Sequence, residues 1–286
     1  MLLFGGTGMV GTRIRELLSD AYIITSPTRQ EVDLTSKISI FNYFSNNLSD
    51  VVVYAAGITN QDIAEKEKEL AKEINTNAIE YICLLARPRE LPVVYFSTDA
   101  VFPCEKSNKP YTEFQKTNPL NYYGITKANG ENAVLSICDN NLVIRLVSVY
   151  SSTFLAKLDF VRRIINKLSH NNSCDGIMDQ HFNPTFSDVA VYALGRALER
   201  EISGILHIGA TDCISNYDFA KLVASTFGYD IKLINAVNFE DLTKGKKVKR
   251  GKFCCIDTAY SQSKLGKEIF LSNFESIAKF KDGYLK

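Results

Sequence analysis

Two side chains that can exchange protons, Tyr123 and Lys127, lie four positions apart in residues 121–131, NYYGITKANGE. We expect this stretch to begin a helix, on which residues four apart share one face with Cβ atoms roughly 6 Å apart. A nearby lysine cation favours the phenolate and should lower the tyrosine pKa from its usual value of about 10. Such a pair could supply the proton that accompanies hydride transfer at a carbonyl or an alcohol. A chance pair on a solvated helix fits the same spacing.

Hydroxyl groups follow an apolar strand predicted over residues 93–96, because the next residues are Ser97, Thr98 and Asp99. Ligands bind at the carboxyl ends of strands in open α/β sheets, so a hydroxyl here can hydrogen-bond a substrate oxygen. A simple cap on the strand end is the alternative.

A glycine-rich turn lies between a short apolar strand at residues 1–4 and a helix predicted over residues 12–18. The glycines at positions 5, 8 and 11 allow a tight turn and close approach of a pyrophosphate, and the free N–H groups at the helix start can face its charge. The turn therefore predicts a dinucleotide-binding site. Its contacts with the cofactor would come from Gly5, Thr7, Gly8, Met9 and Val10.

The loop after the second predicted strand, residues 22–25, indicates which cofactor binds. A fold specific for NAD carries an acidic residue at this strand end to hold the ribose, and residues 26–29, SPTR, contain none. Arg29 with Ser26 or Thr28 could hold a 2′-phosphate, so we expect NADP(H), with NAD(H) as the alternative and Arg29 then an ordinary surface residue. Further contacts are expected from Asp33 and Leu34 near the adenine and from Ala55, Ala56 and Gly57 at the end of the next strand.

Predicted strands and helices alternate over the first 150 residues. Further strands are expected at residues 51–55, 93–96 and 141–147, and a long helix at 62–87. Apolar, β-branched runs such as residues 51–55 are typical of buried parallel strands. The alternation predicts an α/β fold with a doubly wound parallel sheet of the Rossmann type.

After residue 150 the alternation is less regular. We expect helices at residues 154–168, 217–227 and 274–280, a helix capped by Ser187 that runs to residue 199, and strands at 204–208 and 231–236. Ser215 should cap the helix at 217–227. We predict an NAD(P)-binding domain over residues 1–150, with 185–208 returning to it, and a smaller substrate-binding lobe made of 151–184 and 209–286.

Composition excludes several classes of protein. The 286 residues carry a formal net charge of +1 without a long basic block, which gives no reason to expect nucleic acid. No apolar run approaches the roughly 20 residues of a membrane span, and no secretory signal is present, so we expect a cytoplasmic protein that does not bind membranes. The seven cysteines are scattered, and we interpret them as reduced thiols. With His170, His181 and His207 also lacking ligand spacing, no metal site is expected; His207 should be a buried strand residue.

In its motifs the chain resembles the extended short-chain dehydrogenase/reductase superfamily, and within it the branch of dTDP-4-dehydrorhamnose reductase and related nucleotide-sugar 4-keto reductases. The resemblance covers nearly the whole chain. It rests on the turn at 5–11, VDLT at 32–35, AAG at 55–57, FSTDAVF at 96–102, PYTE at 110–113, NPLN at 118–121, YGITK at 123–127, Arg145, MDQ at 178–180, PTF at 184–186 and NYDFA at 216–220.

The resemblance implies roles for these residues. Tyr123 would protonate the C4 oxygen of a nucleotide-linked deoxysugar as NAD(P)H delivers hydride to C4. Lys127 would lower the Tyr123 pKa and hold the nicotinamide ribose, and Thr98 rather than Ser97 would hydrogen-bond the carbonyl. Asp179, Gln180 and Arg250 would contact the sugar nucleotide, where Arg250 could pair with the diphosphate. The implied process is the synthesis of sugars for cell-surface polysaccharides, dTDP-rhamnose among them. The sequence leaves the oligomeric state open and allows a homodimer.

Three positions depart from the reductase pattern, namely Ala100, Ser148 and Ser151. They line the substrate side, so the sugar and the base stay open. The related 4,6-dehydratases carry a glutamate at position 100, which argues against a dehydratase. Two alternatives remain: a nucleotide-sugar epimerase with bound cofactor, and a non-catalytic NADP-binding regulatory subunit. The presence of both Tyr123 and Lys127 argues against the second.

Overall fold

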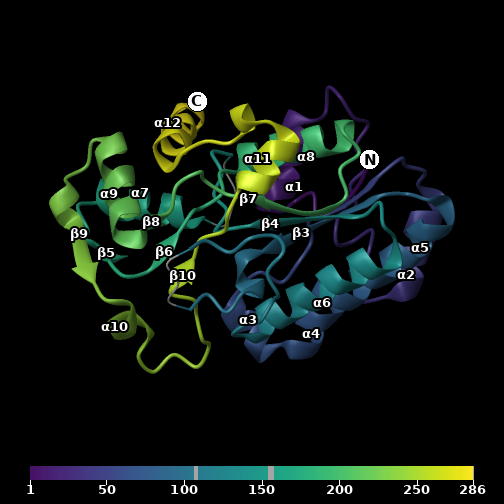
Figure 1. Cartoon of the computed structure of the whole chain (residues 1–286), viewed down its shortest axis with the longest axis horizontal. Coiled ribbons are helices and arrows are strands. Elements are labelled where there is room, and N and C mark those ends of the chain that lie inside the picture. The colour runs from purple at the N-terminus through teal and green to yellow at the C-terminus, as the bar shows by residue number, and fades with distance from the viewer. Residues whose placement is uncertain (106–108, 154–157, 286) are drawn as a thin grey trace.

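The centre of the molecule is a five-stranded parallel sheet. The computed structural model describes residues 1–105, 109–153 and 158–285. In the sheet the strands stand in the order β1-β2-β3-β4-β7, and Figure 1 labels β3, β4 and β7 of this sheet. They are β1 (Leu2–Phe4), β2 (Val52–Tyr54), β3 (Val93–Thr98), β4 (Leu142–Leu146) and β7 (Gly204–Ile208). The prediction of an α/β fold with a parallel, Rossmann-like sheet is confirmed.

Both faces of this sheet are covered, which explains why its strands are mostly apolar. Leu2, Val52 and Val93 stand in register and contribute to one core, whereas Leu3 and Val53, one position on, contribute to the other. Helices α1 (Met9–Leu17) and α8 (Ser187–Glu199) pack together on one face. Helices α2 (Lys37–Asn46), α5 (Ala78–Ala86) and α6 (Tyr122–Ile137) cover the opposite face (Figure 1).

The chain changes direction in the sheet at β1. Thr25 lies beside β1 on the side away from β2, where it forms a single parallel bridge with Leu2. The prediction of a full strand at residues 22–25 is therefore wrong, because this edge faces solvent and Ile23 is 90% exposed. Ligands in such sheets bind in the crevice where the strand order reverses. That crevice lies at the carboxyl ends of β1 and β2.

The helix predicted over residues 62–87 is not continuous. It is divided into α3 (Gln61–Lys66), α4 (Lys68–Lys72), the π-helical turn η1 (Glu73–Asn77), α5 and the 3₁₀ turn η2 (Arg87–Arg89). The break lies at Glu67, whose φ of −113° and ψ of 61° are not helical. Turns of π-helix are frequent at functional sites, and η1 lies against α6.

Two smaller sheets lie in the second half of the chain. One pairs β5 (Cys174–Ile177) with β9 (Ile234–Val237), and the other has the order β10-β6-β8, formed by Phe253–Cys254, His181–Phe182 and Ile214–Ser215. The strand predicted over residues 231–236 is divided between the 3₁₀ turn η4 (Ile231–Leu233) and β9. Most of β5, β6, β8 and β10 were not predicted, because strands of two to four residues carry little periodic signal.

The remaining helices are α7 (Phe160–Ser169), α9 (Asn216–Phe227), α10 (Phe239–Thr243), α11 (Ala259–Leu265) and α12 (Asn273–Tyr284), with 3₁₀ turns η3 (Asp99–Val101) and η5 (Lys267–Ile269). Residues 154–157 of the helix predicted over 154–168 lie outside the described residues. Ser215 caps α9 as predicted, by accepting a hydrogen bond from the Asp218 N–H. Ser187 does not cap α8: it is the first residue of that helix, and its hydroxyl donates to Ser151 Oγ at 2.9 Å.

The interpretation of all seven cysteines as reduced thiols is wrong for one pair. Cys213 and Cys255 form a disulfide with 6.0 Å between their Cα atoms. They are separated by 42 positions in the sequence, so spacing alone could not reveal their proximity. None of the helices in the described parts of the chain has the length and apolar character needed to cross a membrane.

Candidate active site

Helix α6 holds Tyr123 and Lys127 inside the protein. The helix begins where Asn121, its N-cap, accepts a hydrogen bond from the Gly124 N–H at 3.0 Å. Tyr123 is 8% exposed and Lys127 4% exposed. A chance pair on a solvated helix is therefore excluded, because the face that carries both side chains is buried against β3.

Thr98 lies at the end of β3, directly opposite this part of α6. Its hydroxyl accepts from the Ala100 N–H at 3.2 Å and donates to Asp99 Oδ1 at 2.9 Å. The helix can approach so closely because residue 124 is glycine: an added Cβ would lie 2.2 Å from the Ala100 carbonyl oxygen. The structure thus brings Thr98, Tyr123 and Lys127 together at the carboxyl end of β3, as the sequence predicted.

Burial controls the protonation of these groups. It raises the pKa of Tyr123 above its ordinary value, and a hydrogen bond with Thr98 offsets only part of that effect. Burial also lowers the pKa of Lys127 to about 7, against an opposing attraction to Glu131, and raises the pKa of Asp99 to about 6. The predicted fall of the Tyr123 pKa is therefore wrong for this structure, because the net shift caused by burial is upward. The lysine Nζ instead donates to the Phe96 carbonyl at 2.6 Å and lies 3.8 Å from the Tyr95 ring centroid.

A buried ion pair lies next to Lys127 and was missed in the sequence. Glu131, one helical turn after Lys127, accepts from Arg145 at 2.7 and 2.9 Å through both carboxylate oxygens. Ser97 donates to the same carboxylate at 2.5 Å. Its hydroxyl therefore belongs to the buried ion pair, whereas the Thr98 hydroxyl donates to Asp99. A glutamate four positions after Lys127, on the same helix face, was the available signal.

Arg145 also connects this pair to β7. Its Nη1 lies 3.2 Å from Nε2 of His207, which is completely buried as predicted. Because arginine only donates, His207 Nε2 must accept, and its Nδ1–H donates to the Asp257 carbonyl at 3.1 Å. Burial and the neighbouring arginine lower the pKa of His207 to about 3.

The π-helical turn η1 supports the other side of α6. Asn75, which is completely buried, donates to Thr126 Oγ1 at 3.0 Å and to the Ile58 carbonyl at 3.1 Å. Its own carbonyl accepts from the Tyr95 hydroxyl at 2.7 Å. Asn75 was missed in the sequence, although an Asn-Thr-Asn run directly before the apolar second half of the predicted helix was a usable signal.

The predicted dinucleotide-binding residues meet at the crevice between β1 and β2. Gly5 has a φ of +90°, and an added Cβ would lie 2.4 Å from the Ala56 nitrogen. The turn is therefore pressed against residues 55–57. Helix α1 begins after Gly8 without a side-chain cap or an acidic residue in its first turn, so its N–H groups fit a pyrophosphate.

The outer part of the predicted cofactor site is less regular. Arg29 is exposed, and next to it the Thr28 N–H and hydroxyl donate to Glu31 at 2.7 and 2.8 Å. This carboxylate lies two positions beyond residues 26–29, the acid-free stretch from which NADP(H) was predicted. Asp33 is also exposed and accepts from the Thr35 hydroxyl at 2.7 Å and the Thr35 N–H at 2.8 Å, and these hydrogen bonds lower the Asp33 pKa.

The predicted substrate residues gather around the segment 249–254, which crosses the start of α6. Asn121 Nδ2 donates to the Lys249 carbonyl at 2.9 Å, and Gln180 Nε2 donates to the Gly251 carbonyl at 2.7 Å. Arg250 pairs with Asp62 of α3 at 2.7 Å. Asp179 pairs with Lys252, which lowers the Asp179 pKa.

Known proteins share this arrangement. The fold superimposes on a dTDP-4-dehydrorhamnose reductase ortholog from Clostridium acetobutylicum with a TM-score of 0.91, 25% identity, and coverage of 100% of this chain and 99% of that chain. A dTDP-4-dehydrorhamnose reductase from Bacillus anthracis, solved in complex with NADP, has the same fold with a TM-score of 0.89, 23% identity and coverage of 98% of both chains.

Sequence comparison agrees with the fold. A dTDP-4-dehydrorhamnose reductase from Salmonella typhimurium is 32% identical over 232 residues, which are 78% of this chain and 76% of that protein. The family model described as the RmlD substrate binding domain matches residues 1–274. The resemblance inferred from the motifs is thereby confirmed, and the chain belongs to the RmlD substrate-binding domain family.

Proposed function

We propose that this protein catalyses the NADPH-dependent reduction of the 4-keto group of a dTDP-linked deoxysugar, as part of the synthesis of sugars for polysaccharides. The observation that carries the proposal is the convergence of Thr98, Tyr123 and Lys127 at the carboxyl end of β3. Relatives that share most of the chain are named dTDP-4-dehydrorhamnose reductases. Together they support an oxidoreductase of this class.

Tyr123 acts as the general acid. Reduction adds a hydride to C4 and a proton to the carbonyl oxygen, and NADPH, when bound, supplies the hydride. A phenol whose pKa is raised by burial stays protonated at neutral pH and has a proton to give. The Thr98 hydroxyl, which donates to Asp99 Oδ1 in this structure, would turn to donate to the oxygen of the substrate carbonyl and hold it in place.

Lys127 holds the ribose next to the nicotinamide and, when protonated, places a positive charge beside Tyr123. With a pKa of about 7 it exists in both protonation states near neutral pH. Its contact with the Phe96 carbonyl fixes the ammonium group close to the end of β3. A lysine so placed can donate hydrogen bonds to ribose hydroxyls, and its charge favours the phenolate that Tyr123 becomes after giving its proton.

The crevice between β1 and β2 would hold the cofactor. Gly5, Thr7, Gly8, Met9 and Val10 would hold its pyrophosphate at the start of α1, and residues 55–57 would contact its nicotinamide half. The exposed Arg29 holds the 2′-phosphate, with Asp33 and Leu34 near the adenine. Preference for NADPH over NADH requires that Arg29 outweigh the repulsion from Glu31.

The nucleotide sugar binds in the part of the site next to the segment 249–254. This part belongs to the smaller lobe made of residues 151–184 and 209–286. Within the described residues, Nε of Arg250 is buried without a hydrogen-bond partner, so this donor is available to a diphosphate oxygen. Asp179 and Gln180, next to the same segment, contact the sugar nucleotide. The proposal includes a cytoplasmic location and allows a homodimer, which light scattering of the purified protein would test.

The test follows NADPH absorbance while dTDP-linked 4-keto sugars are added singly, with NADH in parallel. Oxidation of NADPH by one sugar, faster than oxidation of NADH, is the expected result. Arg29→Ala should remove the preference for NADPH without lowering the rate with NADH. If NADPH binds and no sugar is reduced, the reductase proposal fails. Conversion of one sugar nucleotide into another would then indicate an epimerase, and co-purification with a second enzyme would indicate a regulatory subunit.

A further inference from the structure

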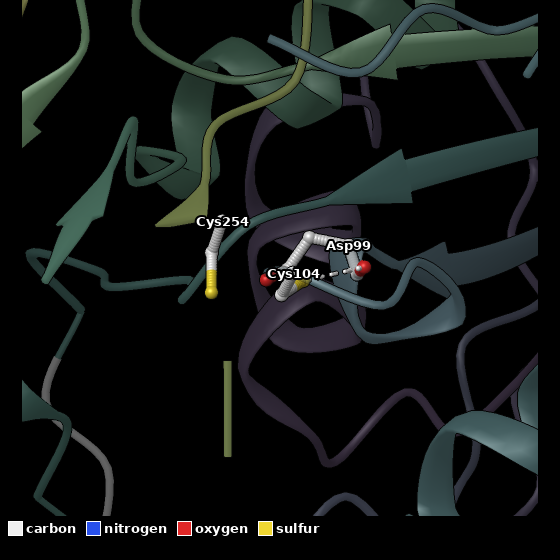
Figure 2. Close-up of side chains that lie close together, drawn as sticks. All are labelled: Asp99, Cys104 and Cys254. Carbon is white, nitrogen blue, oxygen red and sulfur yellow. Dashed lines mark hydrogen bonds between the residues drawn. The ribbon is translucent and has the colours of Figure 1, made fainter. Parts of the chain in front are cut away.

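Three side chains with metal-binding atoms meet beside Thr98, although their sequence spacing predicts no metal site. Asp99 opens η3 at the end of β3, Cys104 lies in the following loop, and Cys254 comes from β10. A carboxylate oxygen and the two Sγ atoms all lie within 4.8 Å of one another. Figure 2 shows Asp99 and Cys104 side by side on one stretch of chain and Cys254 facing them from a separate segment.

The backbone around this cluster is shaped to bring the two sulfurs close. Cys104 is 3% exposed and has a φ of +46°, a left-handed conformation that non-glycine residues rarely adopt and that often marks functional sites. Its carbonyl accepts from the Lys252 N–H at 2.8 Å and the Phe253 N–H at 3.0 Å. At residue 251 an added Cβ would lie 2.1 Å from Cys104 Cβ and 2.7 Å from Cys254 Sγ. The absence of a side chain there gives the sulfurs their room.

Two thiolates and a carboxylate are ligands that zinc prefers. Zinc binds cysteine sulfur at about 2.3 Å and carboxylate oxygen at about 2.0–2.2 Å, with four ligands arranged as a tetrahedron. Donor atoms around such an ion are therefore roughly 3.5 Å apart, which lies within the 4.8 Å that encloses the three ligand atoms here. Asp99 Oδ1 accepts from Thr98, which leaves Oδ2 for the metal.

We propose that Asp99, Cys104 and Cys254 form a binding site for a thiophilic divalent cation of the Zn²⁺ class. The site has three protein ligands and one open position. Because Cys254 belongs to β10 and Asp99 follows β3, the ion links the small three-stranded sheet to the central sheet. The site lies outside the residues proposed for reduction, so it can be tested whether or not a keto sugar is the substrate.

The experiment titrates the full chain, kept reduced with a phosphine and free of oxygen, with Co²⁺. Thiolate ligation produces a sulfur-to-cobalt charge-transfer band, and a tetrahedral site produces strong visible bands. One equivalent of Co²⁺ should saturate both signals, and Zn²⁺ should remove them. Cys254→Ser should weaken Co²⁺ binding by at least the roughly 10- to 100-fold that loss of an outer-shell partner causes. Cys104→Ser should do the same, and Asp99→Asn should weaken binding while keeping the sulfur band.

The other cysteines provide matched controls. Reduction also opens the disulfide between Cys213 and Cys255, so the double variant Cys213→Ser/Cys255→Ser must keep the cobalt signals. Cys174→Ser, in β5, must keep them as well. If wild type shows no sulfur-to-cobalt band, or if Cys254→Ser and Cys104→Ser bind as wild type does, the proposal is wrong. Thermal unfolding of each variant shows that it is folded, and Cys254, which is partly exposed, carries the test if Cys104→Ser does not fold.

Discussion

Around Tyr123 and Lys127 the charged groups are buried and paired, whereas along the segment 249–254 they are paired near solvent. The ion pair of Glu131 and Arg145 has side chains that are 3% and 2% exposed. In the pair of Asp62 and Arg250 the corresponding values are 62% and 34%. Both regions border the same candidate site, and both form ion pairs of 2.7 Å.

The difference indicates what each region does. A buried pair cannot exchange partners without a large loss of free energy, so it fixes the position of α6 and of the side chains that we propose to be catalytic. A pair near solvent contributes little to stability, so Arg250 can leave Asp62 for a diphosphate. We infer that the first region sets the geometry of the reaction and that the second adapts to the nucleotide sugar.

The largest expected effect comes from removing the proton donor of the buried region. Tyr123→Phe keeps the ring but loses the hydroxyl, and kcat should fall by roughly 10²- to 10⁴-fold, measured as NADPH oxidation with the sugar that wild type reduces. NADPH affinity should stay unchanged. Tyr122→Phe, at the neighbouring half-buried position, is the control and should keep full activity. An active Tyr123→Phe enzyme would remove this residue from the mechanism.

The second effect compares the two kinds of ion pair directly. Glu131→Gln leaves Arg145 buried without a compensating charge, so the free energy of unfolding should fall by about 3–5 kcal/mol. Asp179→Asn, next to the segment 249–254, breaks a pair whose side chains are 36% and 31% exposed and should lower it by less than about 1 kcal/mol. Urea unfolding measures both. Similar losses in the two variants would show that burial does not distinguish the regions.

The third effect is a pH dependence that belongs to the buried region alone. The pKa of His207 falls from the ordinary 6.5 to about 3 in the folded protein, so between these values only the unfolded chain binds a proton. Stability contributed by neutral His207 is therefore complete above pH 6.5 and is lost as the pH falls. From pH 6.5 to pH 5 the loss is about 2 kcal/mol.

His207→Gln should remove that part of the acid sensitivity. Arg145 and Glu113 face the histidine, and burial raises the Glu113 pKa, which has the opposite effect on stability. The prediction therefore concerns the difference between wild type and variant, in which the contributions of other groups largely cancel. Equal slopes of unfolding free energy against pH would contradict the assigned neutral state.

The same contrast explains what could be predicted from the sequence. The parallel sheet and α6 follow from local signals, namely apolar runs, glycine positions and i,i+4 spacing, whereas the choice of Thr98 as the partner of Tyr123 came from the family resemblance. The surroundings of these residues follow from neither. Burial at residue 123 raises a pKa that charge spacing alone predicted to fall, because desolvation depends on everything packed around the helix.

Contacts between residues far apart in the sequence also could not be predicted from the sequence. The disulfide between Cys213 and Cys255, the pair of Glu131 and Arg145, and the meeting of Cys104 with Cys254 each join distant segments. The strand predicted at residues 22–25 was wrong because this apolar run lies at the edge of the sheet. It contacts β1 on one side through the bridge of Thr25 with Leu2, and no strand pairs with its other side in the described part of the chain. Local patterns give elements and faces, while pairing across the fold requires the fold itself.

A fourth effect tests whether the glycine-rich turn at residues 5–11 must keep its exact position, as the buried region around Tyr123 and Lys127 does. Gly5→Ala places a Cβ 2.4 Å from the Ala56 nitrogen at a φ of +90°, so the turn must move away from residues 55–57. Gly204→Ala has nearly the same strain, with a φ of +91°, and meets nothing within 4 Å. Both should lose some stability. Only Gly5→Ala should weaken NADPH binding, by about tenfold or more, which is 1.4 kcal/mol or more. Unchanged NADPH affinity in Gly5→Ala would separate the turn from the cofactor.

The smallest effect belongs to the exchange of partners at Arg250. Asp62→Asn should change the free energy of unfolding by less than about 0.5 kcal/mol, because the pair it breaks is largely exposed. If the nucleotide diphosphate competes with Asp62 for the guanidinium, the same substitution should lower KM for the sugar nucleotide and leave kcat unchanged. Arg250→Gln should raise KM, and adding Asp62→Asn to it should have no further effect, since no competition remains. A KM that rises in Asp62→Asn would instead mean that the carboxylate holds Arg250 in position for the substrate, and the segment 249–254 would then be as preorganised as the buried centre.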